Sequence, residues 1–252
     1  MPPPRDPRAT LAELRPFIER ARAFTGWDFA GVHARVLGDG IPWDYTALAR
    51  ERAAASTAVL DTGTGGGERF AEIAAGMPAR FFASESWPPN ARVAAQRLRP
   101  EGIEVTMATA AHLPFADGAF DLVLSRHEEL VPAEIARILR PGGTLLTQQV
   151  APWNWPELTE SFPRRTRFAD HEQEYAQAFT AMGMDVRVRS ARYETAFATL
   201  GDLAFCLAVS PWEIPGFDLE RDIGALIALE ARHGGPDGIV LTEGRYLLEA
   251  RR

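Results

Sequence analysis

Five short apolar runs alternate with helical segments between residues 57 and 150, and this alternation restricts the possible folds more than any other feature. The runs have the composition of buried strands and lie at 58–60, 80–83, 103–107, 120–124 and 144–147. Helical spacing fills three of the intervals, near 68–75, 90–98 and 133–139. The alternation predicts a mostly parallel, doubly wound α/β sheet, which binds ligands at the carboxyl ends of its strands.

The segments that flank this core carry other patterns. A capping-box sequence at 10–13 and apolar helical spacing predict a helix from about 11 to 24, and Asp44 is placed to cap a second helix. Residues 1–8 lack the apolar core of a signal peptide, and we expect an extended leader there. Beyond the core we expect a helix over about 171–182, a strand over about 185–193, a mostly helical insertion over about 195–232, and strand, turn and strand over 238–250.

Composition excludes several classes of protein. All 27 basic side chains are arginines, so the lysine of a Gly-Lys phosphate-binding loop, a Schiff-base enzyme or a Tyr-x-x-x-Lys dehydrogenase is absent. Cys206 is the only cysteine, which excludes an intramolecular disulfide and a cysteine-rich zinc site and favours a reducing, cytoplasmic location. The five histidines show no ligand spacing, so we expect no metal. The formal net charge of -7 weighs against nonspecific binding to nucleic acid or membranes.

The most informative motif follows the first strand of the alternation. Asp61 ends this strand, and glycines at 63, 65 and 67 lead into the next helix, where they let a ligand approach the backbone closely. A dinucleotide fingerprint needs glycine at position 68, but Glu68 stands there, so the loop repels a phosphate and suits a ligand with ammonium and sulfonium groups. Glu85 follows the next strand, where a carboxylate can bind a ribose diol.

These residues resemble the class I S-adenosylmethionine-dependent methyltransferases of the type 11 group, best over residues 57–150. Segments 113–123 and 136–145 carry the resemblance further, because they are similar to the family's entry into its fourth strand and to its fourth helix, turn and fifth strand. The resemblance implies a Rossmann-like, seven-stranded, mostly parallel sheet with a C-terminal antiparallel hairpin strand, N-terminal helices and a small helical cap insertion. It divides one domain into an N-terminal helical extension (1–56), a cofactor-binding core (57–150) and a substrate side (151–252).

The resemblance also implies S-adenosyl-L-methionine as cofactor and S-adenosyl-L-homocysteine as product. It assigns the methionine moiety to Asp61, Gly63, Thr64, Gly65 and Gly67, with Ser125 and Arg126 beneath it. Glu85 would bind the ribose, and Ser86 or Trp87 would cover one face of the adenine, unless Trp87 only packs beside the prolines that follow it. Thr109 and Ala110 would lie at the adenine edge, although many relatives have aspartate where Thr109 stands.

The segment after the fourth strand carries the candidate catalytic residues. His127 is suited to removing a proton from a phenol, hydroxyl or ammonium group, and Glu128 could orient it or act itself. The alternative is that both residues cap the helix that begins near 132. For the acceptor side we expect Trp43, Tyr45, Gln149, Trp153 and Trp212, with loop anchoring or core packing as the alternative role of such residues.

We therefore predict a cytoplasmic methyltransferase, monomeric or homodimeric, that acts on an oxygen or nitrogen of a small molecule such as a specialised metabolite. It would have neither a nucleic-acid nor a membrane partner. One alternative is a methyltransferase for ribosomal RNA or protein, for which Arg164-Arg165-Thr166-Arg167 is the only suggestive basic cluster. The others are a noncatalytic S-adenosylmethionine-binding module and a nicotinamide oxidoreductase, which Glu68 and the missing lysine disfavour.

Overall fold

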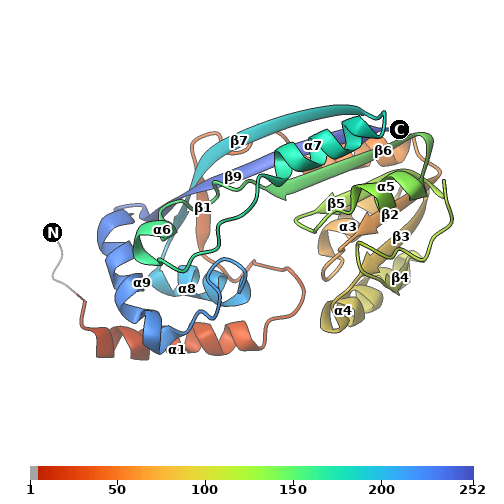
Figure 1. Ribbon diagram of the computed structural model, residues 1–252. Coiled ribbons are helices and arrows are strands. Elements are labelled where there is room, and N and C mark those ends of the chain that lie inside the picture. Colours follow the sequence, from red (N-terminus) through yellow and green to blue (C-terminus); the bar gives the residue numbers. More distant parts are fainter. Residues whose placement is uncertain (1–4) are drawn as a thin grey trace.

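The computed structural model describes residues 5–252, in which nine strands form one sheet (Figure 1). Their order is β1-β7-β9-β6-β5-β2-β3-β4, with β8 paired to β9. The strands are β1 (Ala34–Leu37), β2 (Ala58–Thr62), β3 (Arg80–Glu85), β4 (Glu104–Met107), β5 (Phe120–Arg126), β6 (Leu139–Val150), β7 (Asp185–Phe197), β8 (Gly234–Gly235) and β9 (Gly238–Arg251).

Strands β2 to β6 pair in parallel, whereas β9 runs antiparallel to β6 and β7. This confirms the predicted doubly wound α/β sheet with an antiparallel C-terminal strand. The sheet has two short strands more than the seven predicted. Of these, β1 pairs antiparallel with the end of β7, and β8 makes a two-residue hairpin with β9.

The nine helices in the described chain are α1 (Pro7–Arg22), α2 (Tyr45–Ala54), α3 (Glu68–Ala74), α4 (Pro88–Leu98), α5 (Pro132–Ile138), α6 (Leu158–Ser161), α7 (His171–Ala181), α8 (Leu200–Val209) and α9 (Leu219–His233), and a 3-10 turn covers Arg99–Glu101. Three of these helices, α3, α4 and α5, occupy the intervals that the alternation predicts. No helix within residues 5–252 is long and apolar enough to cross a membrane.

Two apolar clusters cover the two faces of the sheet. Residues of α2, α3 and α4 pack against one face, and residues of α5 and α7 pack against the other. Every residue of β2 is buried, because this central strand contacts both clusters. Burial on both faces explains why the central strands read as continuous apolar runs.

A third cluster forms a helical lobe beyond one end of the sheet. The N-terminal helix α1 packs there against α8 and α9, together with α6 and the ends of the long strands β7 and β9 (Figure 1). Helix α1 and the predicted insertion therefore build one lobe, although about 180 residues separate α1 from α8 in the sequence.

Three expected boundaries differ from the structure. Asp6 caps α1, which begins at Pro7, so the expected leader is shorter, and residues 1–4 lie outside the described part of the chain. Strand β7 continues to Phe197, so the helical insertion starts later than 195. Residues 238–250 form one uninterrupted strand instead of strand, turn and strand. Gly244 lies within that strand because the Trp153 ring packs against its α-carbon.

Candidate functional site

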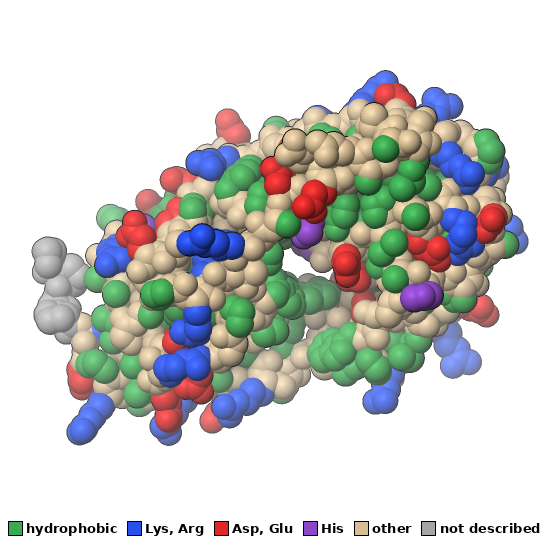
Figure 2. Space-filling model, in the orientation of Figure 1, with side chains coloured by type: hydrophobic (Ala, Val, Ile, Leu, Met, Phe, Trp, Pro, Cys, Tyr) green, Lys and Arg blue, Asp and Glu red, His purple; other side chains and the backbone are tan. Residues whose placement is uncertain are grey.

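The predicted site residues gather where the carboxyl ends of four parallel strands meet. The register places Thr62 beside Ser84 and Ser125, and Arg126 beside Gln148. Asp61, Glu85 and His127 therefore come from adjacent positions along one edge of the sheet. Figure 2 shows the surface hollowed into a cleft between this part of the molecule and the helical lobe. We call this hollow the interlobe cleft.

The glycine loop between β2 and α3 has a backbone that a side chain would disrupt. Gly63 and Gly65 have φ values of 62° and 61°, in the left-handed region. A Cβ atom on Gly63 would collide with the Glu128 side chain, and one on Gly65 would collide with the Trp27 indole. These two glycines therefore allow neighbouring segments to approach the loop closely.

Glu85 ties the loop to the end of β3. One carboxylate oxygen accepts a hydrogen bond from the Gly65 N–H at 2.7 Å, and the other accepts from the Trp87 N–H at 2.8 Å. The Glu85 carbonyl accepts from the Ala108 N–H at 3.2 Å, so the segment with Thr109 and Ala110 lies alongside. A carboxylate has about four acceptor positions, so Glu85 keeps capacity for a ribose diol.

The structure thus brings together the predicted adenine and ribose residues. Ser86 and Trp87 follow Glu85 and are exposed, as is Thr109, while Ala110 is half-buried. Glu85 brings these residues near the glycine loop, because it is hydrogen-bonded both to Gly65 and to Ala108.

Asp61 gives the loop its acidic character. The pKa of Asp61 is raised to about 7, chiefly by burial and also by the nearby Glu85 and Glu128, while the charge of Arg126 opposes the rise. Because a nearby cation favours the ionised form of an acid, a ligand with ammonium and sulfonium groups suits this position. Buried carboxylates beside a loop of bare backbone supply the hydrogen-bond acceptors and the negative charge that such a ligand needs.

Arg126 places a guanidinium in the same region. Its Nε is buried without a hydrogen-bond partner among the described residues, and burial together with Arg69 lowers the pKa of the side chain. Ser125, directly before it, is fully buried, and its hydroxyl also has no partner within residues 5–252. The expected position of both residues beneath the cofactor fits this burial.

His127 and Glu128 adopt an arrangement that excludes the helix-capping alternative. The N-cap of α5 is Val131, and no side chain caps this helix. His127 has a φ of 60°, its N–H donates to the Gln148 carbonyl at 2.9 Å, and its ring keeps exposed surface. Even so, desolvation by the surrounding protein, together with Arg126 and Arg245, lowers the pKa of the His127 ring well below its usual value.

Glu128 reaches back over the glycine loop. The pKa of the Glu128 carboxyl is raised to about 7, chiefly by burial and also by the nearby Glu85 and Glu129. No hydrogen bond joins Glu128 to His127 within the described chain, so the predicted orienting role is not seen. Nor do residues 5–252 contain a group of three or more His, Cys, Asp or Glu side chains that could hold a metal ion.

Three of the predicted acceptor residues are buried behind the cleft. Trp43 is 8% exposed and donates its indole N–H to Gln148 Oε1 at 2.8 Å. Tyr45 is 6% exposed, and its hydroxyl donates to the Ser125 carbonyl at 3.2 Å. Gln149 donates its amide to the Glu128 carbonyl at 2.8 Å. These contacts fix the floor of the cleft.

A tryptophan that the sequence reasoning missed lies against the glycine loop. Trp27 touches Gly65, stacks on Phe29 at 5.6 Å between ring centroids, and meets the predicted Trp212 at 5.9 Å. Trp27 and Trp212 are 42% and 49% exposed, and they connect the helical lobe with the cofactor loop. The sequence of residues 27–43 is rich in aromatic residues and glycine, but no local pattern in it predicts contact with the glycine loop.

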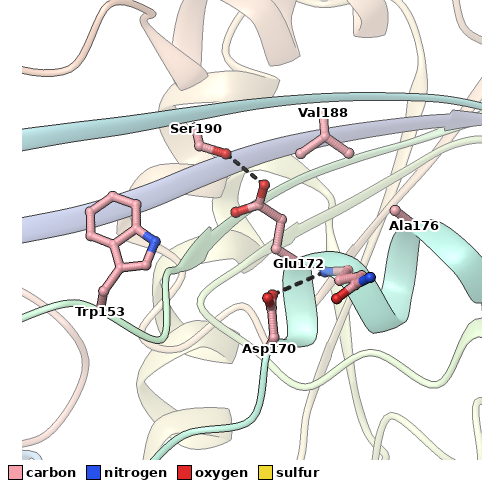
Figure 3. Close-up of a pocket in the computed structure, with 7 residues that line it drawn as sticks. Trp153, Asp170, Glu172, Ala176, Val188 and Ser190 are labelled. Atoms are coloured by element: carbon pink, nitrogen blue, oxygen red, sulfur yellow. Dashed lines mark hydrogen bonds between the residues drawn. The ribbon is translucent and has the colours of Figure 1, made fainter.

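The remaining predicted acceptor residue, Trp153, lines a different cavity. This cavity of about 440 Å³ lies between α7 and β7, with Glu172 and Ser190 joined by a 2.7 Å hydrogen bond on its wall (Figure 3). The glycine loop, Asp61 and Glu85 do not line this cavity. The site built by the strand ends is therefore the interlobe cleft.

The sequence of the core matches known methyltransferases. Residues 60–147 match the family model described as a methyltransferase domain. A stretch of 98 residues is 36% identical to the methyltransferase GfsG of Streptomyces halstedii, covering 34% of this chain and 35% of that protein. A stretch of 127 residues is 29% identical to the demethylmenaquinone methyltransferase of Thermus thermophilus, covering 46% of this chain and 57% of that protein. The chain thus aligns with only one third to just over half of the length of these relatives.

Solved structures resemble nearly the whole chain. A functionally unknown protein from Deinococcus radiodurans has a TM-score of 0.61 at 18% identity, covering 87% of this chain and 91% of that one. A putative methyltransferase from Bacillus halodurans has a TM-score of 0.59 at 18% identity, covering 82% and 97%. The [4+2]-cyclase SpnF also has a TM-score of 0.59, at 20% identity, covering 97% and 94%. These likenesses show the fold of the chain, and the match of the core shows that residues 60–147 are similar to a methyltransferase domain.

Proposed function

We propose that this protein binds S-adenosyl-L-methionine in the interlobe cleft and transfers its methyl group to a small molecule. The observation that carries the proposal is the joining of Asp61, Glu85 and the glycine loop at one sheet edge, inside the segment that matches the methyltransferase domain. Asp61 and the backbone of Gly63, Thr64, Gly65 and Gly67 would hold the methionine moiety, with Ser125 beneath it. Glu85 would bind the ribose, and Ser86, Thr109 and Ala110 would border the adenine.

The bound cofactor would supply a methyl group already activated by a positively charged sulfur. The protein then has to align the acceptor, exclude water and take up any proton that the acceptor loses. Glu128 is the best-placed group for that proton, because its pKa of about 7 lies near the working pH and its side chain lies over the glycine loop. His127, beside it, would contact the acceptor.

Two observations support a small acceptor over RNA. Arg164 forms an ion pair with the buried Asp222, and the Arg165 side chain, 9% exposed, pairs with Glu213 at 3.6 Å. Two arginines of the basic cluster at 164–167 therefore form ion pairs inside the helical lobe and are not available to contact phosphates. In addition, one relative of the core is named a demethylmenaquinone methyltransferase.

Trp27 and Trp212 supply an aromatic wall on the lobe side of the cleft, which suits a planar or apolar acceptor. Trp43, Tyr45 and Gln149 would act from the floor, whereas Trp153 lines the separate cavity between α7 and β7.

Methyl transfer is tested by incubating the protein with methyl-labelled S-adenosylmethionine and separate pools of phenols, aliphatic alcohols, amines, ribosomal RNA and protein. We expect label in a small-molecule pool, and S-adenosylhomocysteine in equal amount. Label in RNA or protein alone would contradict a small acceptor. Tight cofactor binding without transfer to any pool would favour a noncatalytic binding module.

A further inference from the structure

Three side chains from separate segments form a hydrogen-bonded relay at the floor of the interlobe cleft. The Trp43 indole N–H donates to Gln148 Oε1 at 2.8 Å, and Gln148 Nε2 lies 3.4 Å from His127 Nε2. Trp43 and Gln148 are only 8% and 6% exposed, so the hydrogen bond between them is shielded from water. Trp43 precedes α2, Gln148 lies in β6, and His127 follows β5.

The chemistry of the three groups sets the direction of every hydrogen bond in the relay. An indole N–H can only donate, so the oxygen of the Gln148 amide must face Trp43. The amide NH2 therefore faces His127, and an amide nitrogen donates but does not accept. The facing ring nitrogen, Nε2, must then accept and carry no proton. In a neutral ring the proton is consequently on Nδ1.

Further contacts hold the ring in this state. The His127 N–H donates to the backbone carbonyl of the same Gln148, which fixes the residue at a φ that few side chains adopt. Arg126 from the end of β5 and Arg245 from β9 face the ring, and both disfavour a positive charge on it. Glu128 follows His127 in the chain but makes no hydrogen bond to it within the described residues. No hydrogen bond to Nδ1 is formed within residues 5–252 either.

We propose that Gln148, oriented by Trp43, is a positioning residue that keeps His127 neutral with its proton on Nδ1, so that His127 donates a hydrogen bond to an acceptor oxygen. This inference rests on the proposed function and narrows its acceptor from an oxygen or nitrogen compound to an oxygen compound. An oxygen has one lone pair to accept this hydrogen bond and another to attack the methyl group. A neutral amine nitrogen has a single lone pair and cannot do both.

The acceptor is then a hydroxyl compound. Its O–H proton passes to the Glu128 carboxylate, an oxygen lone pair forms the new C–O bond, and the C–S bond breaks with its electron pair going to sulfur. The products are a methyl ether and the neutral thioether of the cofactor. His127 stabilises the negative charge that develops on the oxygen, and it loses no proton in this step.

The protonated ring nitrogen can be identified by nitrogen-15 NMR of the histidine side chains, with His127→Phe used to assign the signals. For the free protein we expect the pattern of an Nδ1–H imidazole at neutral pH. Gln148→Glu keeps the size of the side chain and an acceptor for Trp43, but it turns a carboxylate oxygen toward the ring, so we expect the proton to move to Nε2. Gln173→Glu, on the exposed face of α7, is the matched control and should leave the His127 signals unchanged.

A wild-type pattern with the proton on Nε2, or on both nitrogens at neutral pH, would overturn the proposal. Activity gives a second test, using a phenol and the aniline of the same shape. We expect methylation of the phenol only, and a loss of kcat on the order of 10²-fold in Gln148→Glu with a smaller change in KM. Faster methylation of the aniline would also overturn it. An Nδ1–H pattern without turnover of any acceptor would instead contradict the proposed function.

Discussion

Two buried acids, Asp61 and Glu128, dominate the electrostatics of the interlobe cleft at the scale of single residues. The pKa of each is raised to about 7, chiefly by burial and also by the other acids nearby. Ionising both carboxyls therefore costs free energy in the free protein. Binding of a cationic ligand would relieve that cost.

Replacing Asp61 by asparagine should stabilise the free protein at alkaline pH. The folded pKa of Asp61, about 7, lies above the value of about 3.9 in an unfolded chain. Between these values the folded state binds more protons than the unfolded state, so its stability falls as pH rises, and the full penalty is present above pH 7. The stability of Asp61→Asn should exceed that of the wild type at pH 8 by at most about 4 kcal/mol, and the gain should shrink toward pH 4.

Urea unfolding between pH 5 and pH 8 measures this difference. The exposed Asp39, in the turn after β1, offers the matched control Asp39→Asn, which should track the wild type across the range. An Asp61→Asn variant that is less stable than the wild type at pH 8 would show that this carboxylate is satisfied without a ligand.

Glu128 should control the pH dependence of the reaction. If its carboxylate takes up the acceptor proton, kcat/KM should rise with pH and level off above about pH 7, because this ratio reports the pKa of the free enzyme. Glu128→Gln should remove the rising limb and lower kcat on the order of 10²-fold. A pH profile unchanged in the variant would assign the limb to another group.

Sequence alone could locate the cofactor residues but not the relay behind them. Asp61, Glu85 and the glycines lie at fixed distances along the chain from strands that can be recognised, so topology brings them together. The role of Trp27 and the pairing of Gln148 with Trp43 depend on contacts between distant segments. The Trp43 to Gln148 hydrogen bond, for example, joins residues 105 positions apart, and no local sequence pattern predicts such a pair.

At the scale of the elements, the predicted strands and helices of the core are confirmed because each has a local cause. The Asp44 side chain accepts from the Ala47 N–H at the start of α2, as its position predicts. Strand β1 was missed because three of its four residues are exposed and its pairing with the end of β7 is long-range. Gly244 was interpreted as a turn residue, whereas its lack of a side chain serves the packing of Trp153.

Two glycine-to-alanine changes should therefore have opposite effects. An alanine Cβ at 244 would lie 2.6 Å from the Trp153 ring, so Gly244→Ala should destabilise the protein by about 1–3 kcal/mol. Gly224 lies in α9 with nothing within 4 Å of an added Cβ, so Gly224→Ala should stabilise it by about 0.5–1 kcal/mol. Chemical denaturation measures both values. Equal effects of the two changes would contradict the contact with Trp153.

At the scale of the whole molecule, one continuous sheet carries two lobes. Strands β7 and β9 extend from the core into the helical lobe, and α1 returns from the N-terminus to complete it (Figure 1). The residues that we propose for cofactor binding lie on the core, whereas Trp27 and Trp212 come from the lobe. The same fold also serves a [4+2]-cyclase, so the architecture alone does not establish methyl transfer.

The most direct test of the account is the melting temperature of the protein with S-adenosylmethionine, S-adenosylhomocysteine or NAD. A ligand at 100 times its Kd adds about 2.7 kcal/mol of stability, which corresponds to a rise of roughly 5–10 °C for a chain of this size. We predict that rise with both adenosyl ligands, none with NAD, and its loss in Asp61→Ala but not in Asp39→Ala. Stabilisation by NAD, or by none of the three ligands, would contradict the assignment of the cleft.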